Sequence, residues 1–264
     1  MNNAFYASDY IIVGLDFDGV LAQGLNTKIK YAKKWIDLDL KLGQTKKEGF
    51  NKLVKSLGRT DLAYSDLTKD LMKQYTLEYE VPLDCKEVLG KLFLENFRFC
   101  VITSRTNEEY PYAEAFIKEN YGNLIENIHN ESPHPNPENR WEIKKREKSY
   151  FVHYLKPRIY IDDDIEKLKA LRNYPVELFY CRQPENFDKD LGILEKIRIQ
   201  EFNDWSKFYD MVIQIKDLHE AICWKFGIVN KFSNLTKIYR EFHKLSCYQK
   251  ENLLLEYNQE RQVA

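Results

Sequence analysis

The sequence lacks every segment that would mark a secreted or membrane-bound chain. No run approaches the ~18 consecutive apolar residues that a membrane-spanning helix needs, and the first ten residues, MNNAFYASDY, have neither a basic start nor an apolar block, so we expect no secretory signal. The five cysteines are widely spaced and form no CxxC pair, which excludes a disulfide framework and a zinc ribbon and is typical of a reducing compartment. We therefore expect a soluble cytoplasmic protein that spans no membrane.

An excess of one charge is also missing. The 264 residues hold 40 Lys and Arg against 41 Asp and Glu, a net charge of −1, so no global field favours nucleic acid or a membrane surface, and any such partner must use a local patch. The hydrophobic content of 44% is enough for a packed core. At roughly 150 residues per domain, the length indicates one large domain or two smaller ones.

Short apolar runs alternate with helical patterns along the chain. We expect strands at 11–15, 97–103, 124–128, 158–161, 176–181 and 198–202, and helices at 84–95, 108–120, 138–155 and from 204 to the end. Three prolines predict a loop over 129–140. Buried strands alternating with helices are typical of a parallel sheet covered on both faces. The sequence therefore predicts an α/β fold, a three-layer α/β/α arrangement around a parallel sheet.

Two regions depart from this alternation. Residues 22–83 are rich in lysine and predict a small helical insert, and residues 206–264 predict a helical extension, which leaves 1–21 and 84–205 as the core. Between 22 and 59 the insert has ten basic side chains against three acidic ones, a net charge of +7. A basic insert favours an anionic substrate by raising its local concentration, and the alternative is a solvated lysine-rich face.

The first candidate site follows the first predicted strand, at Asp16 and Asp18. Two carboxylates at positions i and i+2 of an extended chain lie on the same side, and they repel unless a cation or proton lies between them. We expect Mg²⁺, because no cysteine or histidine is near in sequence. Gly19 lets the chain turn away at once. An EF-hand loop is excluded because Val20 and Thr27 stand where its acids belong, and a solvated turn is the alternative.

Polar residues also follow two later strands. Thr103, Ser104 and Arg105 end the second predicted strand, where a hydroxyl and backbone amides suit a phosphoryl group or simply cap a helix. The pair Asp162 and Asp163 ends the strand at 158–161, where three consecutive acids need a shared cation or start a helix.

A fourth element is one lysine upstream of the acid pair. The candidates are Lys144, Lys145 and Lys148. A fixed ammonium group offsets negative charge in such a site, whereas the alternative is a solvated helix face.

Taken together and in order, the four elements resemble the haloacid dehalogenase-like (HAD) superfamily of phosphatases, across about residues 11–181. The matching segments are IIVGLDFDGVL, the strand ending at Thr103, the lysine and IYIDD. Relatives with an IDD ending often have the lysine about fourteen residues upstream, which favours Lys148. The paired-acid ending at Asp162 and Asp163 and the TSR element are similar to 5′-nucleotidase-like members. The family's more common further aspartate, four residues beyond the pair, is absent.

The resemblance implies a mechanism and a set of roles. Asp16 would attack phosphorus to form an aspartyl-phosphate, and Asp18 would act as acid and then base. Mg²⁺ would be held by Asp16, the Asp18 backbone carbonyl and the Asp162 and Asp163 pair.

The remaining roles concern the phosphoryl oxygens and the substrate. The resemblance implies that Thr103 and Lys148 hold the oxygens. Ser104 and Arg105 are expected to bind substrate. The insert falls where relatives carry a cap. His129 and His134 are not expected to be catalytic.

Three functions follow as hypotheses. The first is a Mg²⁺-dependent phosphomonoesterase acting on a small phosphorylated metabolite, such as a nucleoside monophosphate. The second is a polynucleotide end-processing phosphatase that uses the basic insert. The third is a catalytically inactive binding or regulatory protein that works through its C-terminal helices, which also offer a surface for a homodimer or a protein partner.

Overall fold

The computed structural model describes residues 10–130, 133–135, 143–145, 148–186, 191–192, 196, 198–226, 241 and 244–263. The fold is built on a six-stranded sheet in which all neighbouring strands are parallel, in the order β3-β2-β1-β6-β7-β8. The strands are β1 (Ile11–Leu15), β2 (Phe97–Thr103), β3 (Ile125–Asn130), β6 (Ile159–Asp162), β7 (Glu177–Cys181) and β8 (Ile199–Phe202).

The central strands are apolar along nearly their whole length because both faces of the sheet are covered. β1 is also packed closely against its neighbour β6, where Gly14 pairs with Tyr160. A Cβ atom at Gly14 would lie only 2.8 Å from the Tyr160 ring. A glycine at this position of β1 therefore makes room for the aromatic ring of the next strand.

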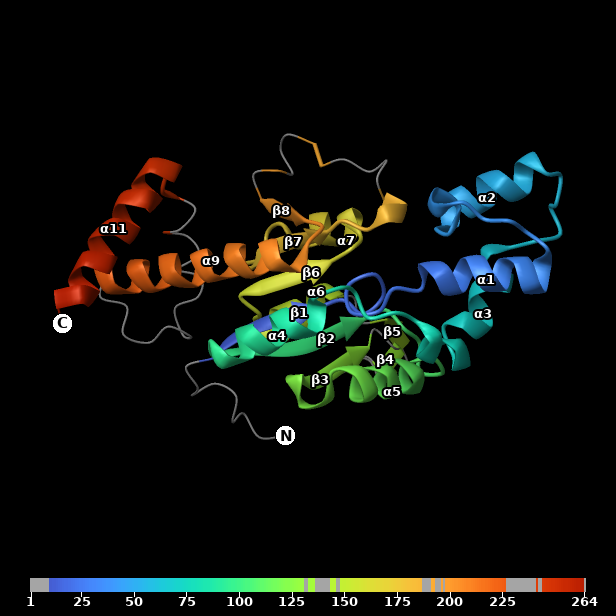
Figure 1. The fold of residues 1–264 in the computed structure, drawn as a ribbon, viewed down its shortest axis with the longest axis horizontal. Helices are drawn as coiled ribbons and strands as arrows, with labels where there is room; N and C mark the ends of the chain where they lie inside the picture. The colour runs from blue at the N-terminus through green and yellow to red at the C-terminus, as the bar shows by residue number, and fades with distance from the viewer. Residues whose placement is uncertain are drawn as a thin grey trace.

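Helices cover both faces of the sheet (Figure 1). One hydrophobic cluster joins the sheet to α4 (Cys85–Leu94), α5 (Tyr110–Asn120) and α9 (Trp205–Lys225). A second cluster joins it to α6 (Lys148–Leu155) and α7 (Ile165–Leu171). Alternate residues of one strand enter the two clusters, for example Ile161 and Tyr160 of β6. The expected three-layer α/β/α fold is therefore confirmed.

The region expected to form a helical insert contains its own hydrophobic cluster, centred on Tyr31, Phe50, Val54 and Leu67. It lies beyond the carboxyl ends of β1 and β2 in Figure 1. Its elements are α1 (Leu25–Ile36), η2 (Leu42–Gln44), α2 (Lys47–Ser56), α3 (Tyr64–Leu71) and η3 (Gln74–Glu78). We refer to residues 24–79 as the insert.

The C-terminal part is helical in α9 and α11 (Cys247–Val263). The first turns of α9 belong to the sheet's own covering layer, because Trp205, Phe208 and Val212 lie in its hydrophobic cluster. The later turns of α9 pack against α11 through residues such as Ile222 and Leu253. In Figure 1, α11 lies at the end of the molecule opposite the insert. Among the helices of the described residues, none is long and apolar enough to cross a membrane.

The region before α6 differs from the prediction. The expected helix over 138–155 is wrong for residues 143–145, which form β5 (Ile143–Lys145) and pair antiparallel with β4 (Pro133–Pro135). The described part of the expected helix is α6, Lys148–Leu155. The expected loop over 129–140 is also wrong at both strands, since β3 extends to Asn130. Residues 136–142 lie outside the described residues. The segment KKREK has no start signal, so its helix propensity alone could not locate the first turn.

Candidate active site

Three neighbouring strands end at the same edge of the sheet, and each ends in a predicted site residue. Asp16 follows β1, Asp162 closes β6 and Thr103 closes β2. The Asp16 amide donates to the carbonyl of Ile161 at 2.8 Å, which extends the pairing of β1 and β6 up to the acids. Ligands of parallel α/β sheets bind beyond the carboxyl ends of the strands. The order of the strands therefore places these residues where a ligand is expected.

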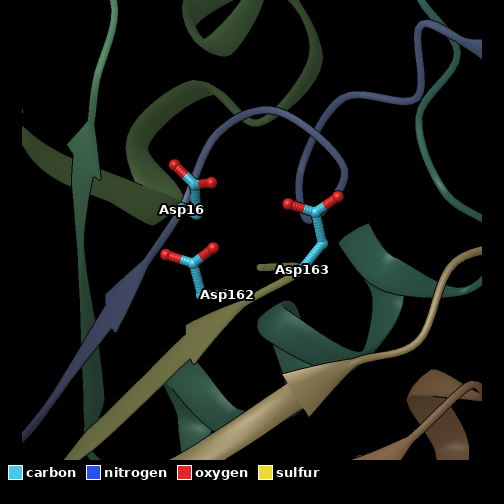
Figure 2. Close-up of side chains that lie close together, drawn as sticks. All are labelled: Asp16, Asp162 and Asp163. Carbon is cyan, nitrogen blue, oxygen red and sulfur yellow. The ribbon is translucent and has the colours of Figure 1, made fainter. Parts of the chain in front are cut away.

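The carboxylates of Asp16, Asp162 and Asp163 form one buried cluster (Figure 2). Each offers an oxygen that lies within 4.8 Å of an oxygen of the others. Three ionised groups this close repel strongly unless positive charge is shared among them. We refer to these three residues as the acidic cluster.

Lys148 supplies part of that positive charge from the first turn of α6. Its ammonium group lies 2.8 Å from Asp16 Oδ1 and 2.6 Å from Asp162 Oδ2, and its side chain is only 5% exposed. Burial opposes the charged ammonium, but the two carboxylates raise the pKa of Lys148 above its ordinary value. The structure thus brings Lys148 to the cluster. Lys144 and Lys145 lie on β5, and the positions of their side chains are outside the described part of the chain.

Asp162 is the most enclosed of the three acids. Its carboxylate accepts hydrogen bonds from the Tyr160 hydroxyl and from the Asp164 amide, each at 3.0 Å. Burial, followed by the charge of Asp16, raises the pKa of Asp162, while Lys148 acts in the opposite direction. Asp164 faces elsewhere, because its side chain accepts from the Glu166 amide and caps α7. The acidic triplet therefore divides into two cluster members and one helix cap.

Thr103, the last residue of β2, and Ser104, which follows it, have different surroundings. Thr103 is fully buried, and its Oγ1 accepts a hydrogen bond from the Arg105 amide at 3.2 Å, so its hydroxyl proton is left to donate. Ser104 is half-buried, and its Oγ lies 3.2 Å from the ammonium group of Lys167 on α7. The structure therefore sets a hydroxyl and an ammonium group side by side after β2.

Asp18 and Arg105 form a bidentate ion pair. Arg105 Nη2 and Nε lie 2.7 and 2.9 Å from the two carboxylate oxygens of Asp18. The same guanidinium donates to the Thr76 hydroxyl at 2.7 Å and to the carbonyl of Met72, both in the insert region. Burial acts to raise the pKa of Asp18, but Arg105 outweighs it and holds that pKa below its usual value. Arg105 is fully buried, so its guanidinium joins the insert to Asp18.

Gly19 meets the requirement for a turn after the acids. Its φ is +82°, in the left-handed region that glycine favours. A Cβ atom there would lie 2.3 Å from Asp163 Oδ2, far inside contact distance. Gly19 therefore allows both the turn and the close approach of the Asp163 carboxylate.

We expect Gly19→Ala to lower the free energy of unfolding by about 3 kcal/mol and to displace Asp163, since a side chain in the left-handed region and a steric clash are combined. Gly58→Ala is the matched control, because Gly58 has φ +67° and no atom within 4 Å of an added Cβ. It should show the backbone effect alone, about 1–2 kcal/mol. Urea unfolding measures both. Equal losses in the two variants would contradict a special role for Gly19.

Two residues that sequence reasoning missed contact Asp163. The Lys46 ammonium group, from the insert, lies 2.6 Å from Asp163 Oδ2, and the side-chain amide of Asn186 (Nδ2) donates to the backbone carbonyl of Asp163 at 2.9 Å. Asn186 belongs to η5 (Pro184–Asn186), which follows β7. Lys46 was one of ten basic residues in the lysine-rich segment. No local signal distinguished it from the others.

Of the two histidines named from sequence, only His129 has a described side chain. His129 lies on β3 with its ring 5.5 Å from the Phe151 ring, and burial lowers its pKa. His134 lies on β4, and its side chain is outside the described residues. Among the described side chains, His129 is not part of the acidic cluster.

The donors present fit a hard divalent cation. The acidic cluster offers only carboxylate oxygens, which Mg²⁺ prefers, and no sulfur or imidazole donor is among them. When ionised, the three carboxylates of the acidic cluster place three negative charges within a few ångströms of one another. A cation would relieve the repulsion between them, which Lys148 and Lys46 offset only in part.

Comparison with known proteins gave likenesses in structure alone. A "predicted phosphoglycolate phosphatase" from Haemophilus somnus 129PT is 14% identical, with 78% of this chain and 99% of that chain covered and a TM-score of 0.49. A "predicted phosphatase" from Clostridium acetobutylicum is 16% identical, with 78% and 100% covered and a TM-score of 0.49. A HAD-superfamily hydrolase from Ehrlichia chaffeensis is 14% identical, with 78% and 98% covered and a TM-score of 0.45.

No family model matches the sequence, and no curated protein matches it. The function is therefore argued from the geometry of the site.

Proposed function

We propose that this chain is a divalent-cation-dependent phosphomonoesterase of the HAD type, which acts on a small phosphorylated metabolite. The observation that carries the proposal is the acidic cluster at the ends of β1 and β6, in which Lys148 forms ion pairs with both Asp16 and Asp162. A purely structural role does not require three buried carboxylates so close together, because unrelieved repulsion destabilises a fold.

Asp16 is the nucleophile in this proposal. A carboxylate oxygen of Asp16 attacks phosphorus as the bond from phosphorus to the leaving oxygen breaks, which forms an aspartyl-phosphate. Water then attacks that phosphorus, and the Asp16 carboxylate is released together with inorganic phosphate. Lys148, already beside Asp16, offsets the charge of the phosphoryl oxygens, and the buried Thr103 hydroxyl donates to one of them.

Asp18 is the acid and base. It gives a proton to the leaving oxygen and later takes one from the attacking water. The Arg105 ion pair stabilises the ionised form of Asp18, which suits the second step. The first step requires Asp18 to hold a proton, and therefore requires this ion pair to loosen once substrate is bound.

Asp16, Asp162 and Asp163 would hold the cation, with the backbone carbonyl of Asp18 as a further ligand. When bound, the cation would supply charge stabilisation to the transferring phosphoryl group. Mg²⁺ is the cation we propose, because its ligands in proteins are carboxylate and carbonyl oxygens.

A small substrate is favoured over a polynucleotide by the ion pairs within the insert. Lys30 pairs with Glu78, Lys33 pairs with Asp37 and Asp39, and Arg59 pairs with Asp61. Asp37 and Asp39 are already counted in the net charge of +7 for residues 22–59, whereas Glu78 and Asp61 lie outside that range and offset two further positive charges. A nucleoside monophosphate remains our best single substrate class.

The test is a screen of phosphomonoesters with purified protein, in Mg²⁺ and in a chelator, with the Asp16→Asn variant as the background. We expect release of phosphate that needs both the cation and Asp16. Oligonucleotides with terminal phosphates form a separate arm at two salt concentrations, since phosphate contacts of a nucleic-acid site weaken steeply with salt. Turnover in the oligonucleotide arm alone would favour the end-processing alternative. No cation-dependent release from any ester would favour the binding or regulatory protein, whose partner would meet α9 and α11.

A further inference from the structure

One lysine of the insert, Lys46, places its ammonium group against the acidic cluster. Lys46 Nζ lies 2.6 Å from Asp163 Oδ2 and 3.8 Å from Glu185 Oε1, and both acids are buried, with side chains 7% and 8% exposed. Lys46 itself is 32% exposed. It is separated from Asp163 by 117 positions in the sequence. The contact therefore joins two distant segments at Asp163, one of the residues of the proposed cation site.

Both sides of this contact are braced by other hydrogen bonds. On the insert side, Lys46 directly precedes α2, and the carbonyl of the neighbouring Thr45 accepts from the Tyr64 hydroxyl at 2.9 Å. On the core side, Asn186 of η5 holds the Asp163 carbonyl. Because the backbone at each side is held, a movement of this part of the insert moves the Lys46 ammonium group relative to Asp163.

The charges explain why the contact forms. Four carboxylates, those of Asp16, Asp162, Asp163 and Glu185, meet two ammonium groups in this region. Lys148 is the countercharge of Asp16 and Asp162, whereas Lys46 is the countercharge of Asp163 and Glu185. A buried carboxylate that loses its countercharge is strongly destabilised. Asp163 thus needs either Lys46 or another cation.

We propose that Lys46 is a countercharge carried by the insert that competes with the divalent cation for Asp163, so that insert closure and cation occupancy oppose each other. A dication at the acidic cluster would take over the neutralisation of Asp163 and would repel an ammonium group a few ångströms away. The contacts of Lys46 with Asp163 and with Glu185 of η5 would then weaken. This inference rests on the cation site of the proposed function, but not on any substrate.

The test is direct titration of the full chain with Mn²⁺, followed by electron paramagnetic resonance, without substrate. Lys46→Met should tighten Mn²⁺ binding by about tenfold or more, because a positive charge is removed next to the cation. Lys46→Arg, which keeps the charge, should restore the affinity of the parent. Lys47→Met is the matched control, since Lys47 is the next residue and is exposed, and it should leave the affinity unchanged.

A second measurement needs no variant. Hydrogen exchange of backbone amides at residues 41–48 should become faster in the parent chain when Mn²⁺ is added, and should already be fast in Lys46→Met. The inference is overturned if the parent binds Mn²⁺ and Lys46→Met binds it no more tightly, or if the cation slows exchange at 41–48. Neither of these two results would contradict the proposed phosphatase activity. If neither chain binds a divalent cation, both this inference and the cation dependence of the proposed function are wrong.

Discussion

Replacing Asp16 with asparagine is expected to lower kcat by about 10⁴-fold or more, because loss of a nucleophile removes the covalent step itself. The fold should survive. Lys148 keeps its 2.6 Å contact with Asp162, and one of three neighbouring negative charges disappears. Since the charge of Asp16 raises the pKa of Asp162, the midpoint of thermal unfolding should stay level or rise. Phosphate release and a thermal melt measure the two effects.

The matched control for Asp16→Asn is Asp164→Asn. Asp164 lies beside the cluster in sequence, but its carboxylate caps α7 by accepting from the Glu166 amide, and asparagine caps helices equally well. We expect Asp164→Asn to retain nearly full activity. If both variants lose activity to the same extent, or if Asp16→Asn keeps a tenth of the parent's kcat, Asp16 is not the nucleophile.

Replacing Lys148 with methionine is expected to remove activity and also to destabilise the protein by about 3–5 kcal/mol, the cost of leaving buried charges without their partner. Asp16 and Asp162 would then face each other with no ammonium group between them. Added Mg²⁺ should recover part of the lost stability, because a dication neutralises the same carboxylates. Urea unfolding with and without Mg²⁺ measures both the loss and its recovery.

Lys91→Met provides the comparison on the surface. Lys91 forms an i,i+4 ion pair with Glu87 at 2.7 Å, and its side chain is 56% exposed. An exposed pair of this kind contributes little to stability because water and salt screen it, and Mg²⁺ should have no specific effect on the variant. Should Lys148→Met unfold as easily as Lys91→Met, the Lys148 ion pairs are not what stabilises the acidic cluster.

Three of the site residues that sequence predicted share one property, which is that they stand at the ends of buried strands. Asp16, Thr103 and Asp162 each follow an apolar run, and parallel strands bring their carboxyl ends to one edge. Local pattern and one rule of topology are enough to place such residues near one another. Their roles in catalysis are still predictions.

Contacts between distant segments could not be predicted in this way. Arg105 and Asp18 are 87 positions apart, and Lys46 and Asp163 are 117 apart. Arg105 was expected to bind substrate, which stays a prediction; in the structure its guanidinium pairs with Asp18 and donates to the Thr76 hydroxyl of the insert. Lys46 looked like its lysine neighbours, because nothing in a single sequence tells which long side chain will reach an acid across a fold. Pairings of this kind depend on how the insert sits on the core.

The start of α6 shows a different limit. Lys144, Lys145 and Lys148 belong to a segment with uniformly high helix propensity. The pairing of β4 with β5 overrides that propensity for residues 143–145. Propensity indicated a helix over 138–155, and the pairing with β4 puts residues 143–145 in a strand instead.

The insert leaves and rejoins the core at a single point. The Gln23 amide donates to the Glu80 carbonyl at 2.8 Å, and the Glu80 amide donates back to Gln23 at 3.1 Å. The polypeptide therefore returns to the place it left, as at the neck of a hairpin. Segments with adjoining ends are the ones that a chain exchanges, shortens or enlarges with least disturbance to its scaffold. The neck makes the insert a self-contained segment over the edge of the sheet that holds the proposed site, so its length and sequence can change while the sheet beneath it stays the same.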